Sequence, residues 1–190
     1  MRYVHRSLPA VTLLMWLAFA WAQSQPDIAD LFNRAANNER TGVARKTSPV
    51  DARKARPGEI VVTIISGEGK ETQSPPAATG DMVVRNRCPA TGNEELLVRA
   101  AKFGERYEGP MSPPDEDGWS TYRPLGNEML YFIVGPADGT LTFTAPWGEA
   151  MTARPGDAIV RDPKDPKDTY RIAAAAFACT YEILRRPKKD

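Results

Sequence analysis

The sequence predicts a mainly β protein with a minor helical part, in which two tandem, small β-rich units follow a signal peptide, a short helix and a linker. Short apolar runs separated by Gly and Pro predict the strands, and a stretch that recurs later in the chain predicts the two units. The 190 residues, 42% hydrophobic and 26% charged, suffice for one domain or two small ones.

Residues 1–22 have the pattern of a secretory signal peptide. Arg2 and Arg6 precede an apolar run that begins at Leu8. The run leads into Ala20-Trp21-Ala22, which has the small-x-small spacing of a cleavage site. A membrane anchor is the alternative, but the run is shorter than the roughly 20 residues that span a bilayer. We expect a periplasmic or secreted protein with no membrane span in its mature chain.

Removal of this segment takes away His5, the only histidine. The mature chain then lacks the imidazole used by Ser-His-Asp triads, Cys-His dyads and most zinc sites, and two cysteines are too few for a thiolate-only zinc site. The 25 Lys and Arg residues are balanced by 24 Asp and Glu residues, unlike the basic stripe of nucleic-acid-binding proteins. We expect no metal, no cofactor and no nucleic-acid partner.

Residues 23–52 are predicted to form a short helix and a polar linker. Asp27 is the expected N-cap of the helix. Apolar residues recur at helical spacing after it: Ile28, Leu31, Phe32 and Ala35. From residue 37 to residue 56 the chain is polar and charged, with few apolar residues to bury, which is typical of a linker.

Beyond the linker, the apolar runs 60–65 and 129–134 are typical of buried strands. Residues 140–145 alternate apolar side chains with threonines, which indicates a strand with one face in water. Because this segment follows the run 129–134 after a short Gly- and Pro-containing turn, we expect the two to form a hairpin.

An internal repeat organises this region. Both copies contain, in order, Gly-Asp, Val-Arg, Phe and Tyr-Glu. The matched positions are Gly80, Asp81, Phe103 and Tyr107 in the first copy and Gly156, Asp157, Phe177 and Tyr181 in the second. The repeat predicts β-rich units at 53–110 and 122–190, joined by a Pro-rich acidic connector at 111–121.

The repeated residues have structural interpretations. Arg154-Pro155-Gly156-Asp157 suits a type II turn, in which Gly takes a positive φ, and the aspartate caps the turn. Each Phe and Tyr pair is four residues apart, so both rings are expected to anchor a core. In the second copy, Ala173–Ala176 favours a helix and the residues after it alternate as in a strand, so we expect a short helical turn that runs into a final strand.

These residues resemble the PGDYG family, small domains of phage and bacterial origin named after a Pro-Gly-Asp-Tyr-Gly motif. Arg53-Lys54-Ala55-Arg56-Pro57 resembles the family's opening, Arg154-Pro155-Gly156-Asp157 its motif, and Phe177 with Tyr181-Glu182 its ending. The resemblance covers two tandem copies and implies a compact β-rich unit. It implies no reaction, because the family has no assigned activity.

Cys88 and Cys179 are the only cysteines, and an even pair in an oxidising compartment favours a disulfide that would join the two halves of the chain. The alternative is that Cys179 is a small buried apolar residue and Cys88 an exposed thiol. The sequence leaves both open.

Three aromatic residues in loops are candidate binding residues: Trp119, Tyr122 and Trp147. Aromatic rings beside Gly and Pro can present flat faces to sugars or peptides, or can cover the ends of thin cores. We expect an exported, non-catalytic binding or envelope-associated accessory protein, with a protein or glycan of the cell envelope as its partner.

The alternative function is a His-free, carboxylate-dependent enzyme that acts on glycans. Carboxylates recur in both units as Asp81, Glu108, Asp157 and Glu182. Paired carboxylates can hydrolyse glycosidic bonds when they face each other across an open groove.

Overall fold

The computed structural model describes residues 27–189 and is mainly β. The predicted signal peptide, residues 1–22, lies outside the described residues. The first elements are α1 (Ile28–Asn37), β1 (Gly42–Lys46), β2 (Val50–Lys54), β3 (Val62–Ile65), β4 (Gly69–Gln73), β5 (Met82–Asn86), η1 (Pro89–Thr91), β6 (Glu95–Val98), α2 (Ala100–Arg106) and β7 (Tyr107–Glu108). The others are β8 (Ser120–Pro124), β9 (Glu128–Ile133), η2 (Pro136–Asp138), β10 (Leu141–Thr144), β11 (Ala150–Ala153), β12 (Ala158–Asp162), β13 (Asp165–Ile172), α3 (Ala174–Thr180) and β14 (Tyr181–Arg185).

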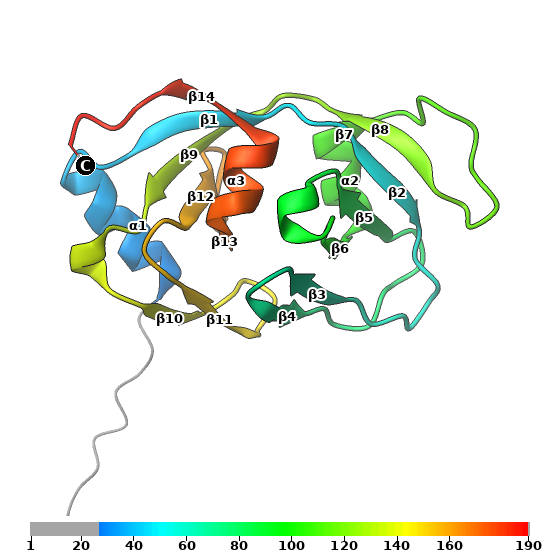
Figure 1. Ribbon diagram of the computed structural model, residues 1–190, viewed down its shortest axis with the longest axis horizontal. Helices are drawn as coiled ribbons and strands as arrows, with labels where there is room; N and C mark the ends of the chain where they lie inside the picture. Colours follow the sequence, from blue (N-terminus) through cyan, green and yellow to red (C-terminus); the bar gives the residue numbers. More distant parts are fainter. Residues whose placement is uncertain (1–26, 190) are drawn as a thin grey trace, which may run out of the picture.

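The strands form two five-stranded antiparallel sheets and two separate hairpins. The first sheet has the order β6-β5-β2-β8-β7 and the second has β13-β12-β9-β1-β14, while β3 pairs with β4 and β10 with β11. We call the first sheet with α2 and β3–β4 the first body, and the second sheet with α1, α3 and β10–β11 the second body. Figure 1 shows the two bodies side by side along the long axis, with both hairpins at the same edge.

Each sheet contains one strand that is distant in the chain from most of its other strands. Strand β1, near the start, lies between β9 and β14 in the second sheet, with Ala44 opposite Met129. Strand β8, which directly precedes β9 in the chain, lies between β2 and β7 in the first sheet, with Tyr122 opposite Val50. The two bodies therefore exchange strands, and separating them would break backbone ladders in both sheets.

Residues 37–56 differ from the predicted linker, because they contain two sheet strands. Ala44 of β1 and Val50 and Ala52 of β2 are buried, and charged residues alternate with them. Small side chains fill these inward positions, so the segment has a low content of large apolar residues although it lies inside both sheets. The composition of the segment is therefore that of a linker, although buried and exposed residues alternate along it as in a strand.

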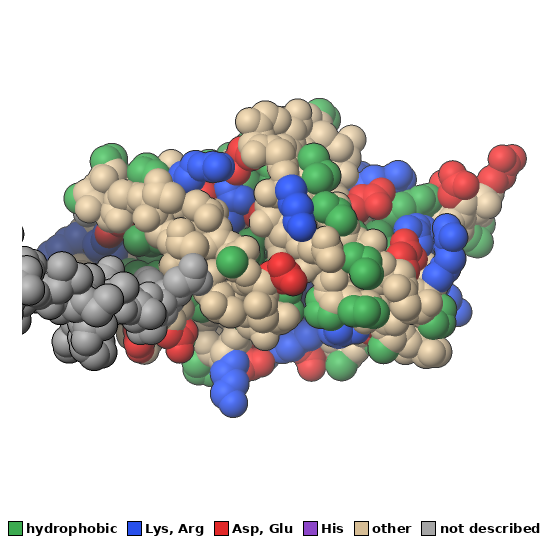
Figure 2. Space-filling model, turned by 90° about the horizontal axis from the view of Figure 1, so that it is seen from below, with side chains coloured by type: hydrophobic (Ala, Val, Ile, Leu, Met, Phe, Trp, Pro, Cys, Tyr) green, Lys and Arg blue, Asp and Glu red, His purple; other side chains and the backbone are tan. Residues whose placement is uncertain are grey.

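Two predictions about the apolar runs were wrong. Strand β9 pairs with β1 and β12, and β10 pairs with β11, so residues 129–134 and 140–145 do not form a hairpin with each other. Residues 60–65 are also not buried on both faces. Ile60, Val62 and Ile64 are exposed, because β3 belongs to a two-stranded hairpin that packs with one face only. Figure 2 shows hydrophobic side chains grouped on this underside of the molecule.

Helix α1 is fixed to the second body by its apolar face. Its buried residues pack against strands β9, β10, β11 and β12; they are Ile28, Leu31, Phe32 and Ala35. The side chain of Asp27 accepts a hydrogen bond of 2.8 Å from the backbone N–H of Ala29, which caps the helix. Arg161 of β12 reaches across with a hydrogen bond of 2.9 Å to the carbonyl of Ala29 and stacks over the ring of Phe32.

Among residues 27–189, no helix is long and apolar enough to cross a membrane.

Candidate functional site

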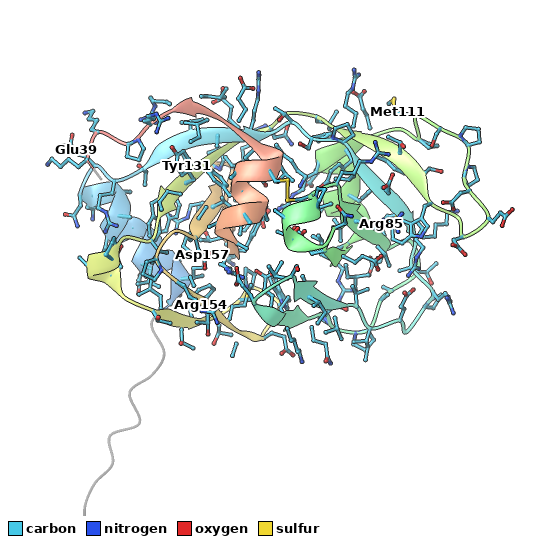
Figure 3. The ribbon with its side chains drawn as sticks, viewed as in Figure 1. Glu39, Arg85, Met111, Tyr131, Arg154 and Asp157 are labelled. Carbon is cyan, nitrogen blue, oxygen red and sulfur yellow. A yellow bond between two sulfur atoms is a disulfide. The ribbon has the colours of Figure 1, made fainter. Side chains whose placement is uncertain are left out.

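Asp157 holds the turn before β12 to the start of α3 (Figure 3). Its side chain accepts hydrogen bonds from the backbone N–H of Arg154 at 2.8 Å and of Ala174 at 3.0 Å, and from Nε of Arg171 at 2.9 Å. Gly156 supplies the positive φ that the turn needs, at 101°. The aspartate therefore fixes three segments of the second body at one point.

Asp81 makes the matching contacts in the first body. Its side chain accepts from the backbone N–H of Ala78 at 2.8 Å and of Ala100 at 3.0 Å, and pairs with Arg99 at 2.5 Å. Gly80 has a φ of 93°. Although burial raises the pKa of Asp81, these hydrogen bonds and the charge of Arg99 hold it below the usual value.

The repeated Phe and Tyr pairs stack in both bodies. The ring centroids of Phe103 and Tyr107 lie 5.1 Å apart, and those of Phe177 and Tyr181 lie 5.2 Å apart. Each phenylalanine packs into the core of its own sheet. Each tyrosine is only half-buried and faces the space between the bodies.

A cavity of about 300 Å³ lies between the two bodies and is lined by residues from both. Aliphatic residues form much of its wall, among them Leu96 and Leu97 from the first body and Met129 and Ile172 from the second. This volume is at the lower end of the range for small-molecule sites, which are mostly apolar with a few placed polar groups.

Three tyrosines line this cavity. Tyr107 and Tyr181, which both follow a core phenylalanine by four residues, lie within electrostatic range of Tyr170 of β13. Burial, followed by the neighbouring phenols, raises the pKa of Tyr181 well above its ordinary value, and burial also raises the pKa of Tyr107. Both phenols are therefore neutral hydrogen-bonding groups near pH 7.

Arg106 of α2 crosses from the first body to the second. Its guanidinium forms an ion pair with Asp168 and lies 5.4 Å from the ring centroid of Tyr170. Lys102, one turn earlier, lies 3.4 Å from the same carboxylate. The charge of Asp168 is therefore shared between two cations of the opposite body.

Lys46 is the cavity cation without a directly paired carboxylate among the described residues. Its Nζ donates a hydrogen bond of 2.6 Å to Oδ1 of Asn86, so it links β1 of the second sheet to β5 of the first. It also lies 5.6 Å from the ring centroid of Tyr181. Burial lowers the pKa of Lys46 to about 8, while the charge of Glu94 raises it and the charge of Arg106 lowers it.

Glu94 lies behind Asn86 and is buried. Its Oε1 accepts a hydrogen bond of 2.7 Å from Nδ2 of Asn86, and its other oxygen accepts one from the hydroxyl of Thr91. Both carboxylate oxygens thus have donors, and Asn86 is hydrogen-bonded both to Glu94 and to Lys46.

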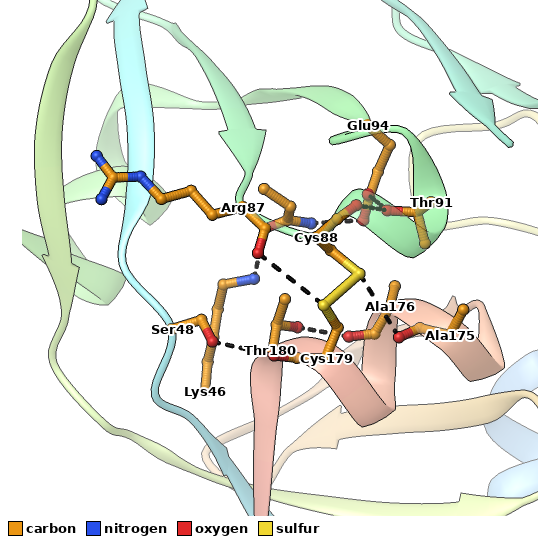
Figure 4. Close-up of a disulfide and its surroundings, with 11 residues drawn as sticks. Lys46, Ser48, Arg87, Cys88, Thr91, Glu94, Ala175, Ala176, Cys179 and Thr180 are labelled. Carbon is orange, nitrogen blue, oxygen red and sulfur yellow. Dashed lines mark hydrogen bonds between the residues drawn. A yellow bond between two sulfur atoms is a disulfide. The ribbon is translucent and has the colours of Figure 1, made fainter.

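A disulfide joins Cys88 and Cys179 beside this network (Figure 4). Cys88 is the N-cap of η1 in the first body, Cys179 belongs to α3 in the second, and their Cα atoms are 5.8 Å apart. The bond fastens the loop that carries Thr91 and Glu94 to the helix on the other side of the cavity.

Arg171 closes the cavity towards the hairpin β3–β4. Its side chain is 2% exposed and lies within 2.9 Å of Asp157, 2.7 Å of Glu68 and 2.5 Å of Glu71. Burial raises the pKa of Glu71, although the charge of Arg171 opposes this effect. The cluster neutralises a buried guanidinium and holds the hairpin against the second body.

The structure does not bring the three candidate aromatic residues to one site. Trp119 is half-buried, and its ring centroid lies 5.1 Å from Cζ of Arg53 and 4.1 Å from Cζ of Arg85. Tyr122 packs edge-on against Phe103 in a separate core cluster. Trp147 lines the central cavity and is tied to the first body.

That tie is a hydrogen bond of 3.2 Å from Nε1 of Trp147 to the hydroxyl of Thr72. Trp147 is 37% exposed and is therefore among the large hydrophobic residues that remain in contact with solvent. Trp147 is thus the one of the three candidates that the structure places at the cavity.

The recurring carboxylates all have structural contacts. Asp81 and Asp157 cap their turns, Glu108 pairs with Arg123, and Glu182 pairs with Arg45 at 2.9 Å. None of these four carboxylates lines the central cavity. Within residues 27–189, no group of three or more His, Cys, Asp or Glu side chains is placed to hold a metal ion.

Sequence reasoning missed most of the polar lining of the cavity. Lys46 lay in the predicted linker, and Arg106 and Tyr170 belong to positions that the repeat does not share. The recurrence of Tyr107 and Tyr181 was the one available signal, because a tyrosine that repeats beside a core phenylalanine can present its hydroxyl at the edge of that core.

Comparison of the chain with protein-family models, curated proteins and solved structures finds no match.

Proposed function

We propose that this chain is a duplicated β-rich unit whose two copies exchange their first strands, and that it binds a small molecule in the cavity between the copies. The order of elements supports the duplication. The first copy runs from β1 to β7 with α2 before its last strand, and the second runs from β8 to β14 with α3 in the same place.

Strand register supports the same proposal. In the first sheet Met82 lies opposite Val98, and in the second the corresponding Ala158 lies opposite Ile172. The exchanged strands also match. The N–H of Leu125, after β8, donates to the carbonyl of Arg106 at 2.8 Å, and the N–H of Thr47, after β1, donates to that of Thr180 at 3.0 Å.

Two further expectations belong to this proposal. The pattern of residues 1–22 supports export to the periplasm or beyond, with a role at the cell envelope. The Pro-Gly-Asp turn at Pro155-Gly156-Asp157 supports descent from a PGDYG-like unit. Neither expectation assigns a reaction.

The single observation that carries the binding function is the cavity itself. Its wall combines aliphatic side chains, neutral phenols and a small number of cations, which suits a ligand with an apolar part. A role as a glycan-cleaving enzyme has no comparable support, because the recurring carboxylates stabilise turns and surface ion pairs outside the cavity.

The binding function can be tested with the neutral apolar dye N-phenyl-1-naphthylamine, whose fluorescence rises when it leaves water. We expect saturable binding of one dye molecule per chain. Leu96→Trp adds bulk at the cavity wall and is expected to abolish binding, whereas Leu184→Trp, at an exposed site on β14 outside the cavity, is the matched control and leaves it unchanged. Equal binding by both variants would refute the cavity as the site.

A further inference from the structure

We propose that the ligand of the central cavity is a small amphipathic carboxylate whose anionic group binds Lys46. This inference rests on the proposed binding function and names the ligand class for the same site. The observation that supports it is the contact that each cation of the cavity wall makes with neighbouring side chains.

Four of the lining cations are already neutralised by contacts. Arg99 pairs with Asp81, Arg106 with Asp168, and Lys102 lies near that same aspartate. Arg171 is surrounded by three carboxylates, with Asp157 at 2.9 Å. An anionic ligand would have to compete with these partners at each of the four positions.

Lys46 differs from these cations because its hydrogen-bond partner is a neutral amide, the side chain of Asn86. An ammonium group has three donors, and one of them reaches Oδ1 of Asn86. The nearby carboxylate of Glu94 is held by Asn86 and Thr91. Further donors of Lys46 can therefore bind an acceptor in the cavity without disrupting an ion pair.

The charges near Lys46 favour its protonated form, because the charge of Glu94 raises its pKa more than the charge of Arg106 lowers it. The charge of Arg106 opposes protonation of Lys46, which places the two groups within electrostatic range across the cavity. A carboxylate beside Lys46 would offset this repulsion and the cost of burial together. The neutral hydroxyl of Tyr181, whose ring lies below Lys46, adds a hydrogen-bonding group that carries no competing charge.

The rest of the wall defines the remainder of the ligand. Leu96, Leu97, Met129 and Ile172 offer apolar contact, so the ligand needs a hydrocarbon or aromatic part as well as its anionic group. A cavity of about 300 Å³ equals the liquid volume of roughly ten water molecules. A carboxylate with a medium-length chain, such as octanoate, is a suitable probe.

Protonation of Lys46 makes the expected affinity depend on pH. The charged groups that face Lys46 are Glu94, from the loop after η1, and Arg106, from α2; the neutral groups are Asn86 of β5 and Tyr181 of β14. Because burial lowers the pKa of Lys46 to about 8, its positive charge decreases as the pH rises above that value. Bound carboxylate would raise this pKa.

The proposal is tested by competition between the neutral dye and three ligands of equal chain length: octanoate, octanol and octylamine. For the wild-type chain at pH 7, we expect octanoate to bind about tenfold or more tightly than octanol, and octylammonium to bind most weakly. The preference for octanoate over octanol should decrease between pH 7 and pH 9.5. Equal affinities of octanoate and octanol at pH 7 would overturn the proposal.

Variants separate this result from the proposed function. Lys46→Met should lose the preference for octanoate while it still binds the dye and octanol, and Lys46→Arg should keep the preference. Lys54→Met, which changes an exposed lysine outside the cavity, is the matched control. A Lys46→Met chain that keeps the preference contradicts the role of Lys46.

If Lys46→Met does not fold, the wild-type pH series and Lys46→Arg still decide the question. If the wild-type chain does not bind the dye at all, the cavity is refuted as a binding site. The two failures therefore have different signatures.

Discussion

The two bodies share a plan but differ at the cavity. Tyr181 lies opposite Lys46 of β1, whereas Tyr107, its counterpart, lies opposite Pro124 of β8. Proline has neither a charge nor a backbone N–H to donate. The residue opposite the tyrosine is thus a cation in the second sheet and a proline without a donor in the first, so the proposed site is asymmetric although the strand pairing is alike.

A second difference lies between the two strands that follow each Gly-Asp turn. Strands β12 and β13 are joined by a tight turn, whereas β5 and β6 are separated by a longer loop that contains η1, Cys88 and Glu94. This loop supplies the disulfide and the buried carboxylate behind Asn86. The Gly-Asp turns, the stacked rings and the strand register therefore recur in both bodies, while most of the polar lining of the cavity occurs in one body only.

Substitution of the two capping aspartates gives the largest expected effect and tests how far the Gly-Asp turns of the two bodies are equivalent. Asp157→Ala should cost about 3 kcal/mol of unfolding free energy, and Asp81→Ala roughly 2 kcal/mol. Asp157 is expected to matter more because its partner Arg171 is 2% exposed, whereas Arg99, the partner of Asp81, is 46% exposed.

Urea denaturation of both variants, with Asp157→Asn and Asp81→Asn as isosteric controls, measures the difference. An equal or larger cost for Asp81→Ala would show that burial of the arginine does not distinguish the two turns.

The pH dependence of stability tests the difference between Lys46 and Pro124, with an expected change of about 2 kcal/mol in unfolding free energy. The native pKa of Lys46 is lowered to about 8, below its unfolded value, so between these values the unfolded chain binds more protons. Stability of the wild-type chain relative to Lys46→Met should therefore rise from pH 8 to about pH 10. Parallel pH profiles for the two chains would contradict a buried, partly deprotonated amine.

The smallest expected effect concerns two exposed ion pairs, one in each sheet. Arg45 pairs with Glu182, and Arg123 pairs with Glu108, at corresponding strand positions. Because both pairs are exposed, Glu182→Gln and Glu108→Gln should each change the unfolding free energy by about 0.5 kcal/mol or less. Thermal or urea unfolding that finds a large cost for one variant alone would break the expected equivalence.

Local features of the fold were accessible from the sequence. The positive φ of Gly156, the capping role of Asp157 and the stacking of Phe177 on Tyr181 all depend on residues close together in the chain. The β-rich character followed from short apolar runs in the same way.

Strand partners were not accessible, because pairing is non-local. Nothing near β1 indicates that its neighbours are β9 and β14, and its buried side chains are as small as Ala44. The candidate site depends on that pairing, since Lys46 meets Asn86 and Tyr181 only when β1 lies in the second sheet. A pattern of charged residues with few large apolar ones has the same composition in a linker and in a strand with small inward residues.

Strand exchange also constrains the order in which the molecule can be completed. Strand β1 leaves the ribosome well before β14, its partner in the second sheet, which lies more than 130 residues later in the chain. The first sheet likewise lacks β8 until the chain has passed residue 124. The second sheet can therefore be completed only after β14 has been synthesised, with the slow, long-range loop closure that such topologies entail.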